Sequence, residues 1–363
     1  SRSKKGKDIM LFSNNVYDFR YVNYEDILEI YKMQSNELNF RIKFTKHGVL
    51  NKLINKIYQL QLSNYNKEGY LDKVIFYSNL NPKSPLPNIA GHKGIIKYNK
   101  LYCFGGHDRN KFIKTGLEIN LDNLELRSLH CPFAEIQFHE LVLYGDDIFL
   151  FGGINGSKNH NQKFLCYKTK LDEWKEINSQ NQPLSRFGHT LTLCDDKMYL
   201  FGGYDQQNQL VGDLMVYNIE ENKWSPMKFK DEPLPRAFHS AVAYDSKIII
   251  FGGKSDSTIF ADIHVFNTKN DRWSTLPLSG DRILPHYFHK ALIYKDWMFV
   301  IGGTNNTELL NPFCIHLITN CVYNLKTGGN DRLLFLNSLI LLYKDYMLMY
   351  GGAPLDSINS SNT

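Results

Sequence analysis

The sequence contains none of the short motifs that mark the common enzyme classes. GxSxG, HExxH, a phosphate-binding P-loop and GxGxxG are all missing from its 363 residues, so a hydrolase nucleophile, a zinc-protease helix and a nucleotide-binding loop have no support. No run of 18 or more apolar residues occurs and no signal-peptide pattern opens the chain. We therefore expect no membrane insertion.

Charge of one sign is not in large excess either. The chain has 42 Lys and Arg against 37 Asp and Glu, a formal net charge of +5. Spread over a protein of this size, that balance is only mildly basic, and it predicts no nucleic-acid partner.

Cysteine is sparse and follows no metal-site or disulfide spacing. The six cysteines include no CxxC pair, and several fall inside apolar runs typical of strands. We interpret them as reduced thiols and predict a cytoplasmic location. They are Cys103, Cys131, Cys166, Cys194, Cys314 and Cys321.

A repeat of about fifty residues is the strongest feature that the sequence does have. A Gly-Gly pair at the end of an apolar run recurs six times, at intervals of 47, 50, 50, 50 and 49 residues. The pairs begin at Gly105, Gly152, Gly202, Gly252, Gly302 and Gly351. With 22 Tyr and 23 Phe, the composition favours strands over helices.

Two further positions recur in register with the glycine pairs. Histidine stands thirteen residues before five of the pairs, and Ser338 takes the sixth place. In three repeats a tryptophan follows the first glycine by about 22 residues, and an aromatic precedes each tryptophan by seven. The histidines are His92, His139, His189, His239 and His289; the aromatic pairs are Tyr167 with Trp174, Tyr217 with Trp224 and Phe266 with Trp273.

These spacings predict four antiparallel strands in each repeat. The stretch from histidine to Gly-Gly fits two strands joined by a tight turn, as in LCDDKMYL and AYDSKIII. Seven residues from aromatic to tryptophan fit a third strand, a turn and a fourth strand. One such sheet cannot bury both faces, whereas six stacked around an axis can. The sequence therefore predicts an all-β, six-bladed β-propeller.

The Gly-Gly pair, the following Tyr and Trp and the fifty-residue spacing resemble Kelch repeats. The resemblance covers about residues 53–352 and is clearest in the repeats that contain Trp174, Trp224 and Trp273. Two repeats depart from it. Ile119 and Leu126 occupy the aromatic positions of the first, and His316 and Tyr323 occupy those of the fifth.

The last repeat must complete its blade with strands from elsewhere, because only eleven residues follow Gly352. We predict that residues 56–78, which include IYQLQL and VIFYS, supply the two outer strands of the blade whose inner strands lie in 333–352. The alternative is an open ring with a frayed last blade. The predicted propeller spans residues 51–355, followed by a disordered tail at 356–363.

Residues 1–50 lie outside the repeats. The sequence predicts a short helix over Tyr24–Gln34, with Asn23 as its cap, and a strand in which Phe40, Ile42 and Phe44 alternate. We interpret the segment as a small cap on the propeller; a remnant of a neighbouring domain is the alternative.

Catalysis has little support. One histidine per blade at the same inner-strand position is typical of a structural residue that bonds a neighbouring blade's backbone. Some propellers similar to Kelch domains are copper oxidases, and Cys103 with the many Tyr and His residues leaves a metal-dependent or small-molecule enzyme at the channel mouth as the alternative. We predict no catalytic residue, metal or cofactor.

The binding hypothesis rests on the loops. The loop after each Gly-Gly pair and the linker into the next blade emerge on one face, which gathers six pairs of loops around a channel mouth. We predict a non-enzymatic module that binds a protein or peptide partner there. The predicted contacts are Arg186, Arg236, His107, Arg109, Tyr204, Asp205, Lys254, His286, Tyr287 and Asn305.

Two of these contacts carry a chemical preference. Arginines at the position of Arg186 and Arg236 hold acidic peptide side chains in BTB–Kelch ubiquitin-ligase adaptors, so the resemblance implies an acidic partner. The alternative is that both arginines pair with acidic residues of adjacent loops, for which Asp205 and Asp256 are the candidates. The resemblance suggests ubiquitin-ligase, cytoskeletal or small-GTPase machinery without choosing among them.

Overall fold

The computed structural model describes the repeats and several N-terminal strands. The described residues are 17–22, 27–32, 38–43, 57–61, 75–80, 89–108, 111–133, 135–325, 336–343 and 346–352. Within them, all regular structure is β-strand, and no helix could cross a membrane. The predicted tail at 356–363 lies outside the described residues.

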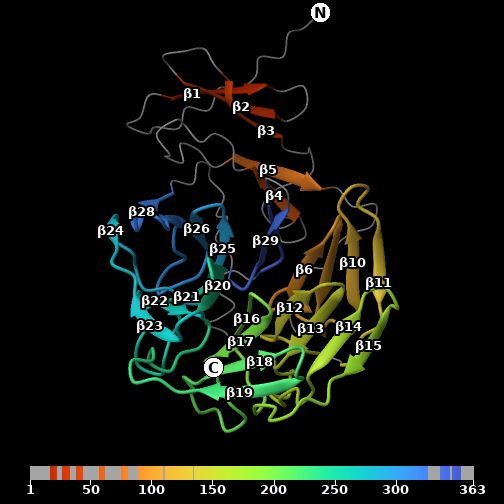
Figure 1. Cartoon of the computed structure of the whole chain (residues 1–363). Coiled ribbons are helices and arrows are strands. Elements are labelled where there is room, and N and C mark those ends of the chain that lie inside the picture. The colour runs from red at the N-terminus through yellow and green to blue at the C-terminus, as the bar shows by residue number, and fades with distance from the viewer. Residues whose placement is uncertain are drawn as a thin grey trace, which may run out of the picture.

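Six antiparallel sheets are arranged around an axis (Figure 1), which confirms the predicted propeller. In the first five blades the strands run from innermost to outermost in chain order. Blade 1 has β6 (Lys93–Lys97), β7 (Lys100–Phe104), β10 (Gly116–Asn120) and β11 (Leu126–Leu129); blade 2 has β12 (Glu140–Tyr144), β13 (Asp147–Phe151), β14 (Leu165–Lys168) and β15 (Glu173–Glu176); blade 3 has β16 (Thr190–Cys194), β17 (Lys197–Phe201), β18 (Leu214–Asn218) and β19 (Lys223–Met227).

The remaining blades follow the same plan with additions. Blade 4 has β20 (Ser240–Tyr244), β21 (Lys247–Phe251), β22 (Ile263–Asn267) and β23 (Arg272–Thr275); blade 5 has β25 (Lys290–Tyr294), β26 (Trp297–Ile301), β27 (Phe313–His316) and β28 (Cys321–Asn324). A short parallel strand, β24 (Ser279–Gly280), adds to the outer edge of blade 5. A small hairpin of β8 (His107–Asp108) and β9 (Lys111–Phe112) follows the first Gly-Gly pair.

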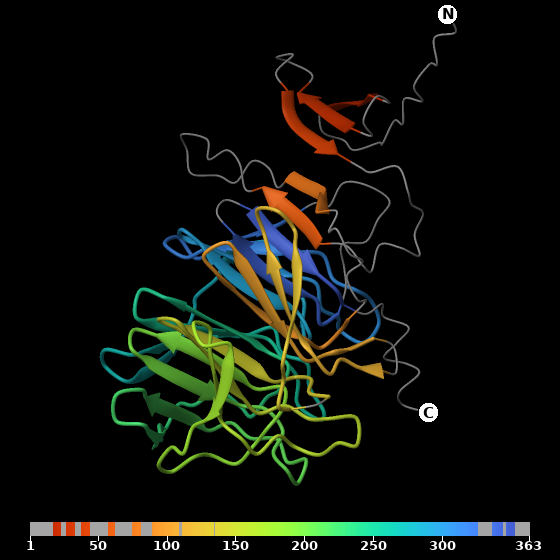
Figure 2. The same cartoon turned by 90° about the vertical axis from the view of Figure 1, so that its right-hand side faces the viewer.

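Blade 6 is built from both ends of the described chain, as the sequence predicted. Its inner strands are β29 (Leu339–Tyr343) and β30 (Tyr346–Tyr350), and its outer strands are β4 (Ile57–Gln61) and β5 (Ile75–Leu80). β30 pairs with β4 in antiparallel register from Tyr346 with Gln61 to Met349 with Tyr58. Figure 2 shows the orange N-terminal strands alongside the blue C-terminal ones. The ring is therefore closed by non-local strand pairing.

The Gly-Gly pairs join neighbouring blades through the backbone. The N–H of the second glycine donates to a carbonyl in the linker of the next blade: Gly153 to Arg186 at 2.8 Å, and Gly203 to Arg236 at 2.8 Å. The first glycine takes a left-handed φ of +69° at Gly152, where an added Cβ would lie 2.3 Å from the same Arg186 oxygen. Only glycine fits this approach.

Aromatic side chains fill the space behind each glycine pair. Phe151, which precedes Gly152, contacts Trp224 of the next blade at 5.4 Å and His189 at 5.7 Å between ring centroids. Phe201 makes the same contacts with Trp273 and His239 of blade 4. Repeated aromatic contacts between blades thus form much of the core.

The predicted cross-strand aromatic pairs are confirmed, although their burial differs. Tyr167 with Trp174, Tyr217 with Trp224 and Phe266 with Trp273 face one another in register. Trp224 is fully buried, whereas Trp174 and Trp273 are half-buried.

The helix predicted over Tyr24–Gln34 is wrong. Ile27–Lys32 forms β2, the central strand of an antiparallel sheet with β1 (Tyr17–Val22) and β3 (Leu38–Lys43). The run ILEIYK satisfies a two-residue period as well as a helical one, and the neighbouring strands select the extended form. The strand predicted around Phe40 and Ile42 is confirmed as β3, which lies against β5 (Figure 1).

Deletion of residues 1–80 tests the closure of the ring. This truncation removes β4 and β5, so we expect the single cooperative unfolding transition to be lost, because β30 then has an unpaired edge. Circular dichroism and tryptophan fluorescence during urea unfolding should give non-coincident curves.

The matched control is deletion of residues 1–50, which removes β1–β3 and leaves β4 and β5 in place. It should unfold in one transition. If the longer truncation melts like the full chain, the outer strands of blade 6 do not close the ring.

Candidate partner-binding face and central channel

The linkers and the loops after the Gly-Gly pairs meet on one face, as the sequence predicted. In five blades, a residue of the linker that enters the blade forms an isolated β-bridge with the residue that follows the glycine pair of the same blade. The bridges are Ala90 with His107, Gln137 with Ile154, Phe187 with Tyr204, Ala237 with Lys254 and Tyr287 with Thr304. We call this surface the loop face.

A ring of six residues surrounds the channel mouth at the loop face. Each residue directly precedes the inner-strand His or Ser and has a φ between 55° and 70°. The six are Gly91, Phe138, Gly188, Phe238, Phe288 and Asn337. The N–H of each residue from Phe138 to Asn337 donates to the carbonyl of its equivalent in the preceding blade, at 2.7 to 3.5 Å. The mouth is therefore held by a belt of backbone hydrogen bonds.

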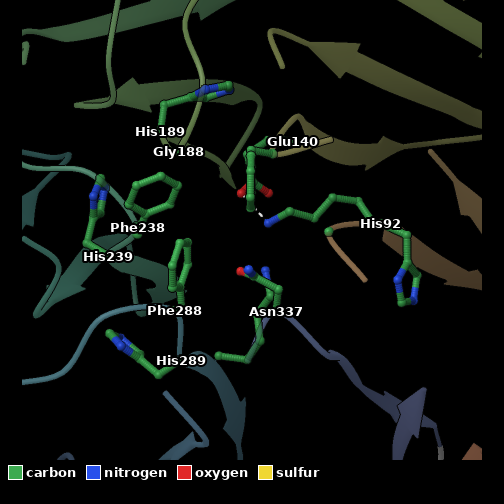
Figure 3. Close-up of a pocket in the computed structure, with 13 residues that line it drawn as sticks. His92, Glu140, Gly188, His189, Phe238, His239, Phe288, His289 and Asn337 are labelled. Atoms are coloured by element: carbon green, nitrogen blue, oxygen red, sulfur yellow. Dashed lines mark hydrogen bonds and ion pairs between the residues drawn. The ribbon is translucent and has the colours of Figure 1, made fainter. Parts of the chain in front are cut away.

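Three phenylalanines of this ring converge over the channel. The ring centroids of Phe238 and Phe288 lie 4.3 Å apart, and Phe138 lies 5.4 Å from Phe238 and 5.9 Å from Phe288. Phe187 joins them at 6.1 Å from Phe238. All four are only half-buried, and Figure 3 shows Phe238 and Phe288 side by side. We call these four residues with Tyr204 the aromatic cluster.

Three of the predicted contact residues lie in or beside this cluster. Tyr204 stacks on Phe187 at 5.4 Å and donates its hydroxyl to Asp256 at 3.1 Å; burial raises the pKa of this phenol to about 12. The Lys254 ammonium lies over the rings of Phe238 and Tyr287, at 5.9 and 5.0 Å. Burial lowers the pKa of Lys254. Tyr287 is buried and donates to Asn306 at 2.6 Å.

The two predicted arginine contacts have intramolecular partners. Arg186 is buried and forms a bidentate ion pair with Asp213 at 2.6 and 3.1 Å, and Arg236 pairs in the same way with Asp262 at 2.6 and 3.0 Å. Both also donate to the carbonyl of a first glycine, at Gly202 and Gly252. The structure therefore supports the intramolecular alternative, with acids that precede the third strand of the same blade.

Asp205 and Asp256, the acids suggested by the sequence, do not pair with the arginines. Asp205 accepts from the backbone N–H groups of Gln207 and Gln209 and shapes its own loop, while Asp256 accepts from Tyr204. The sequence favours Asp205 and Asp256 because they lie in the loops after the glycine pairs. The acids that pair with the arginines instead stand just before the third strand, which brings them beside the linker.

The electrostatic surroundings of Asp262 favour its ionised form beside Arg236. Burial alone would raise the pKa of Asp262, but hydrogen bonds from His264 and Arg236 outweigh it and hold that pKa well below its usual value. The Arg236 guanidinium also lies 4.1 Å from the centroid of Phe260. A carboxylate from a partner would have to displace these contacts.

The other predicted contacts do not gather in the aromatic cluster. His286 is buried, its Nδ1 lies 2.5 Å from the Leu284 carbonyl, and burial lowers its pKa to about 4. Asn305 caps its own loop through the N–H groups of Thr307 and Glu308. His107 is half-buried beside Ala90, and Arg109 lies outside the described residues.

Two of the five inner-strand histidines contact a hydroxyl group of the preceding blade. Nε2 of His239 lies 2.9 Å from the Thr190 hydroxyl, and Nε2 of His289 lies 2.9 Å from the Ser240 hydroxyl. Both hydroxyls are side-chain groups of the preceding blade. Burial holds the pKa values of both histidines well below the usual range, so both rings are neutral.

Beneath the aromatic cluster lies the central channel. A cavity of about 30 Å³ directly under the mouth adjoins a larger one of about 500 Å³, which is lined by the six innermost strands β6, β12, β16, β20, β25 and β29. The residues that follow the inner-strand His or Ser form a second ring inside the channel. They are Lys93, Glu140, Thr190, Ser240, Lys290 and Leu339.

The metal-dependent form of the enzyme alternative requires a group of metal ligands. Over the part of the chain that the structure describes, no three His, Cys, Asp or Glu side chains are grouped to hold a metal ion. Cys103, which the sequence raised as an oxidase candidate, is buried on β7, and burial raises the pKa of its thiol.

Sequence reasoning missed the aromatic cluster and the charged ring in the channel. A signal was available, because Phe138, Phe238 and Phe288 each precede the repeated histidine by one residue, and Lys93 and Lys290 follow it by one. The pattern of one repeat does not show that these positions meet, since they converge only when six blades close.

Strand order and loop positions together define a six-bladed β-propeller whose linkers and post-glycine loops gather on one face. The model of the KLHDC2/KLHL20/DRC7 Kelch-repeats domain matches residues 138–352, and the chain belongs to this Kelch-repeat family. No curated protein matches the chain. Kelch propellers are a common protein-interaction module.

A double-mutant cycle tests the Arg236–Asp262 pair. Asp262→Asn leaves a buried guanidinium without its counter-charge and should destabilise the protein by roughly 3 kcal/mol. Arg236→Met combined with Asp262→Asn should lose less than the sum of the single changes. Urea unfolding measures each free energy.

The matched control for this cycle is Lys269→Met, which removes an exposed cation of blade 4. We expect a change within about 0.5 kcal/mol. Additive losses for Arg236 and Asp262 would show that the pair does not couple.

Proposed function

We propose that this chain is a non-enzymatic interaction module that binds a protein or peptide partner at the centre of its loop face. The observation that carries the proposal is the half-buried aromatic cluster at the channel mouth, in which neighbouring rings of the four phenylalanines and Tyr204 have centroids 4.3 to 6.4 Å apart. Aromatic side chains are the residues that most often dominate binding energy at protein interfaces.

The cluster is prepared for binding at low entropic cost. The belt of backbone hydrogen bonds fixes Phe138, Phe238 and Phe288 at left-handed φ values of 56°, 57° and 60°. Rings fixed before binding lose little freedom when a partner covers them. A partner therefore gains affinity by placing an apolar or aromatic side chain on these rings.

An acidic preference has less support than the resemblance implied. Arg186 and Arg236 are buried and already paired, so they do not offer free guanidinium groups to a partner carboxylate. Lys254 remains at the edge of the cluster, with a pKa lowered by burial. We therefore propose an apolar anchor on the partner, with any acidic group placed near Lys254.

Replacing Phe238 and Phe288 by asparagine tests this function. Asparagine tolerates the left-handed backbone, and the chain itself has Asn337 at the equivalent position, with a φ of 55°. The double variant Phe238→Asn, Phe288→Asn should keep the wild-type melting temperature within a few degrees. We expect it to lose the partners that wild-type protein captures, as read by affinity capture with quantitative mass spectrometry.

Tyr98→Asn is the matched control, because Tyr98 is an aromatic at a φ of 55°, is 82% exposed and lies in the hairpin turn between β6 and β7 on the opposite face. It should capture the same partners as wild type. Unchanged capture by the double variant would remove the aromatic cluster as the binding site.

A further inference from the structure

The second ring inside the channel carries an unbalanced positive charge. It contains two lysines, Lys93 on β6 and Lys290 on β25, against a single carboxylate, Glu140 on β12. Lys93 forms an ion pair with Glu140, which Figure 3 marks by a dashed line. Lys290 makes no ion pair among the described residues. One ammonium group is therefore left over.

The remaining positions of this ring cannot neutralise Lys290. The hydroxyls of Thr190 and Ser240 are engaged with His239 and His289, both of which are neutral, and Leu339 is apolar. Lys290 keeps part of its accessible surface, but that surface faces the two cavities of the channel. The ammonium is thus enclosed by protein yet reachable by a small solute.

Two ammonium groups close together in such an enclosure repel each other. Burial, followed by the repulsion of the Lys93 ammonium, lowers the pKa of Lys290, although Glu140 opposes the shift. An arrangement of like charges away from bulk water is favourable when an ion of opposite sign lies between them.

We propose that the part of the channel directly beneath the aromatic cluster is a binding site for a small oxyanion held between Lys93 and Lys290. The ligand's oxygens accept hydrogen bonds from the two ammonium groups, and Asn337, which lines the cavity of about 30 Å³ (Figure 3), faces the same space. The larger cavity of about 500 Å³ links this site to the length of the innermost strands. The site needs no protein partner, so it stands independently of the proposed function.

Anion binding at this site depends on pH through Lys290. The titratable groups around it are Lys93 on β6, Glu140 on β12 and five neutral histidines at the channel, which are His92, His139, His189, His239 and His289. Because burial and the Lys93 ammonium lower the pKa of Lys290, this group loses its proton at a lower pH than an exposed lysine does. We expect a tight complex at pH 6 that weakens at least about tenfold by pH 9, with proton uptake on binding wherever Lys290 is neutral in the free protein.

Sulfate is the probe for this site, because its charge stays constant between pH 6 and pH 9. Isothermal titration of the full chain with sulfate at pH 6 should give a saturable one-site curve. Sulfate should raise the melting temperature above its value in chloride of equal ionic strength. This rise should be at least about 3 °C larger for wild type than for Lys290→Met. A parallel titration with formate shows whether a carboxylate is accepted as well as a tetrahedral oxyanion.

Two variants should change sulfate binding in opposite directions. Lys290→Met should abolish the titration signal, whereas Glu140→Gln removes the competing carboxylate and should tighten sulfate binding several-fold. General loss of stability cannot produce both results. Lys269→Met, an exposed lysine changed in the same way, should bind like wild type.

A linear, unsaturable response of wild type to both anions would overturn the proposal. Equal stabilisation of wild type, Lys290→Met and Lys269→Met would overturn it too, since that pattern reports only the general exclusion of sulfate from protein surfaces.

Discussion

The contact on which this propeller depends is the hydrogen bond between each Gly-Gly pair and the linker of the next blade. The second glycine donates to a linker carbonyl at 2.7 to 2.9 Å in five blade junctions of the described chain. The first glycine has no Cβ, so that carbonyl can approach closely. A blade cannot bury its faces alone, so this backbone contact and the aromatic stack behind it turn six separate sheets into one core.

The same contact positions the functional surface. The hydrogen bond holds each linker against the glycine pair of the preceding blade. The residues before the inner-strand histidines therefore meet at the channel mouth, where their N–H and carbonyl groups form a belt of hydrogen bonds. Three phenylalanines then meet above the channel, and two lysines and a glutamate meet below them. The loop face and the channel site are both consequences of how neighbouring blades join.

Much of the fold could be predicted from the sequence because its signals are local and repeated. The glycine spacing, the Tyr217–Trp224 type of pair and the alternation in IYQLQL each reflect the geometry of a strand, so the blade count and the closure by β4 and β5 followed from them. The strand at Ile27–Lys32 did not follow, because the apolar residues of the short segment ILEIYK fit either period.

The site was less predictable, since its residues act through contacts between repeats. In the sequence, Arg186 is a cation in a loop with no obvious partner. In the structure it pairs with Asp213, which stands 27 residues later in the chain. Phe238 reads as one more apolar residue, yet it meets Phe138 from a blade 100 residues earlier in the chain. Such meetings are fixed by ring closure and not by any local pattern.

The most direct test of the account compares Gly202→Ala with Gly145→Ala by urea unfolding. Both glycines have a left-handed φ, +68° and +59°, but a Cβ at Gly202 would lie 2.5 Å from the Arg236 carbonyl oxygen, whereas nothing lies within 4 Å at Gly145. The account predicts a loss of about 1–2 kcal/mol for Gly145→Ala, from backbone strain alone, and a loss at least about 2 kcal/mol larger for Gly202→Ala. Equal losses would contradict it, because they would show that the close approach of the next blade's linker does not hold the ring together.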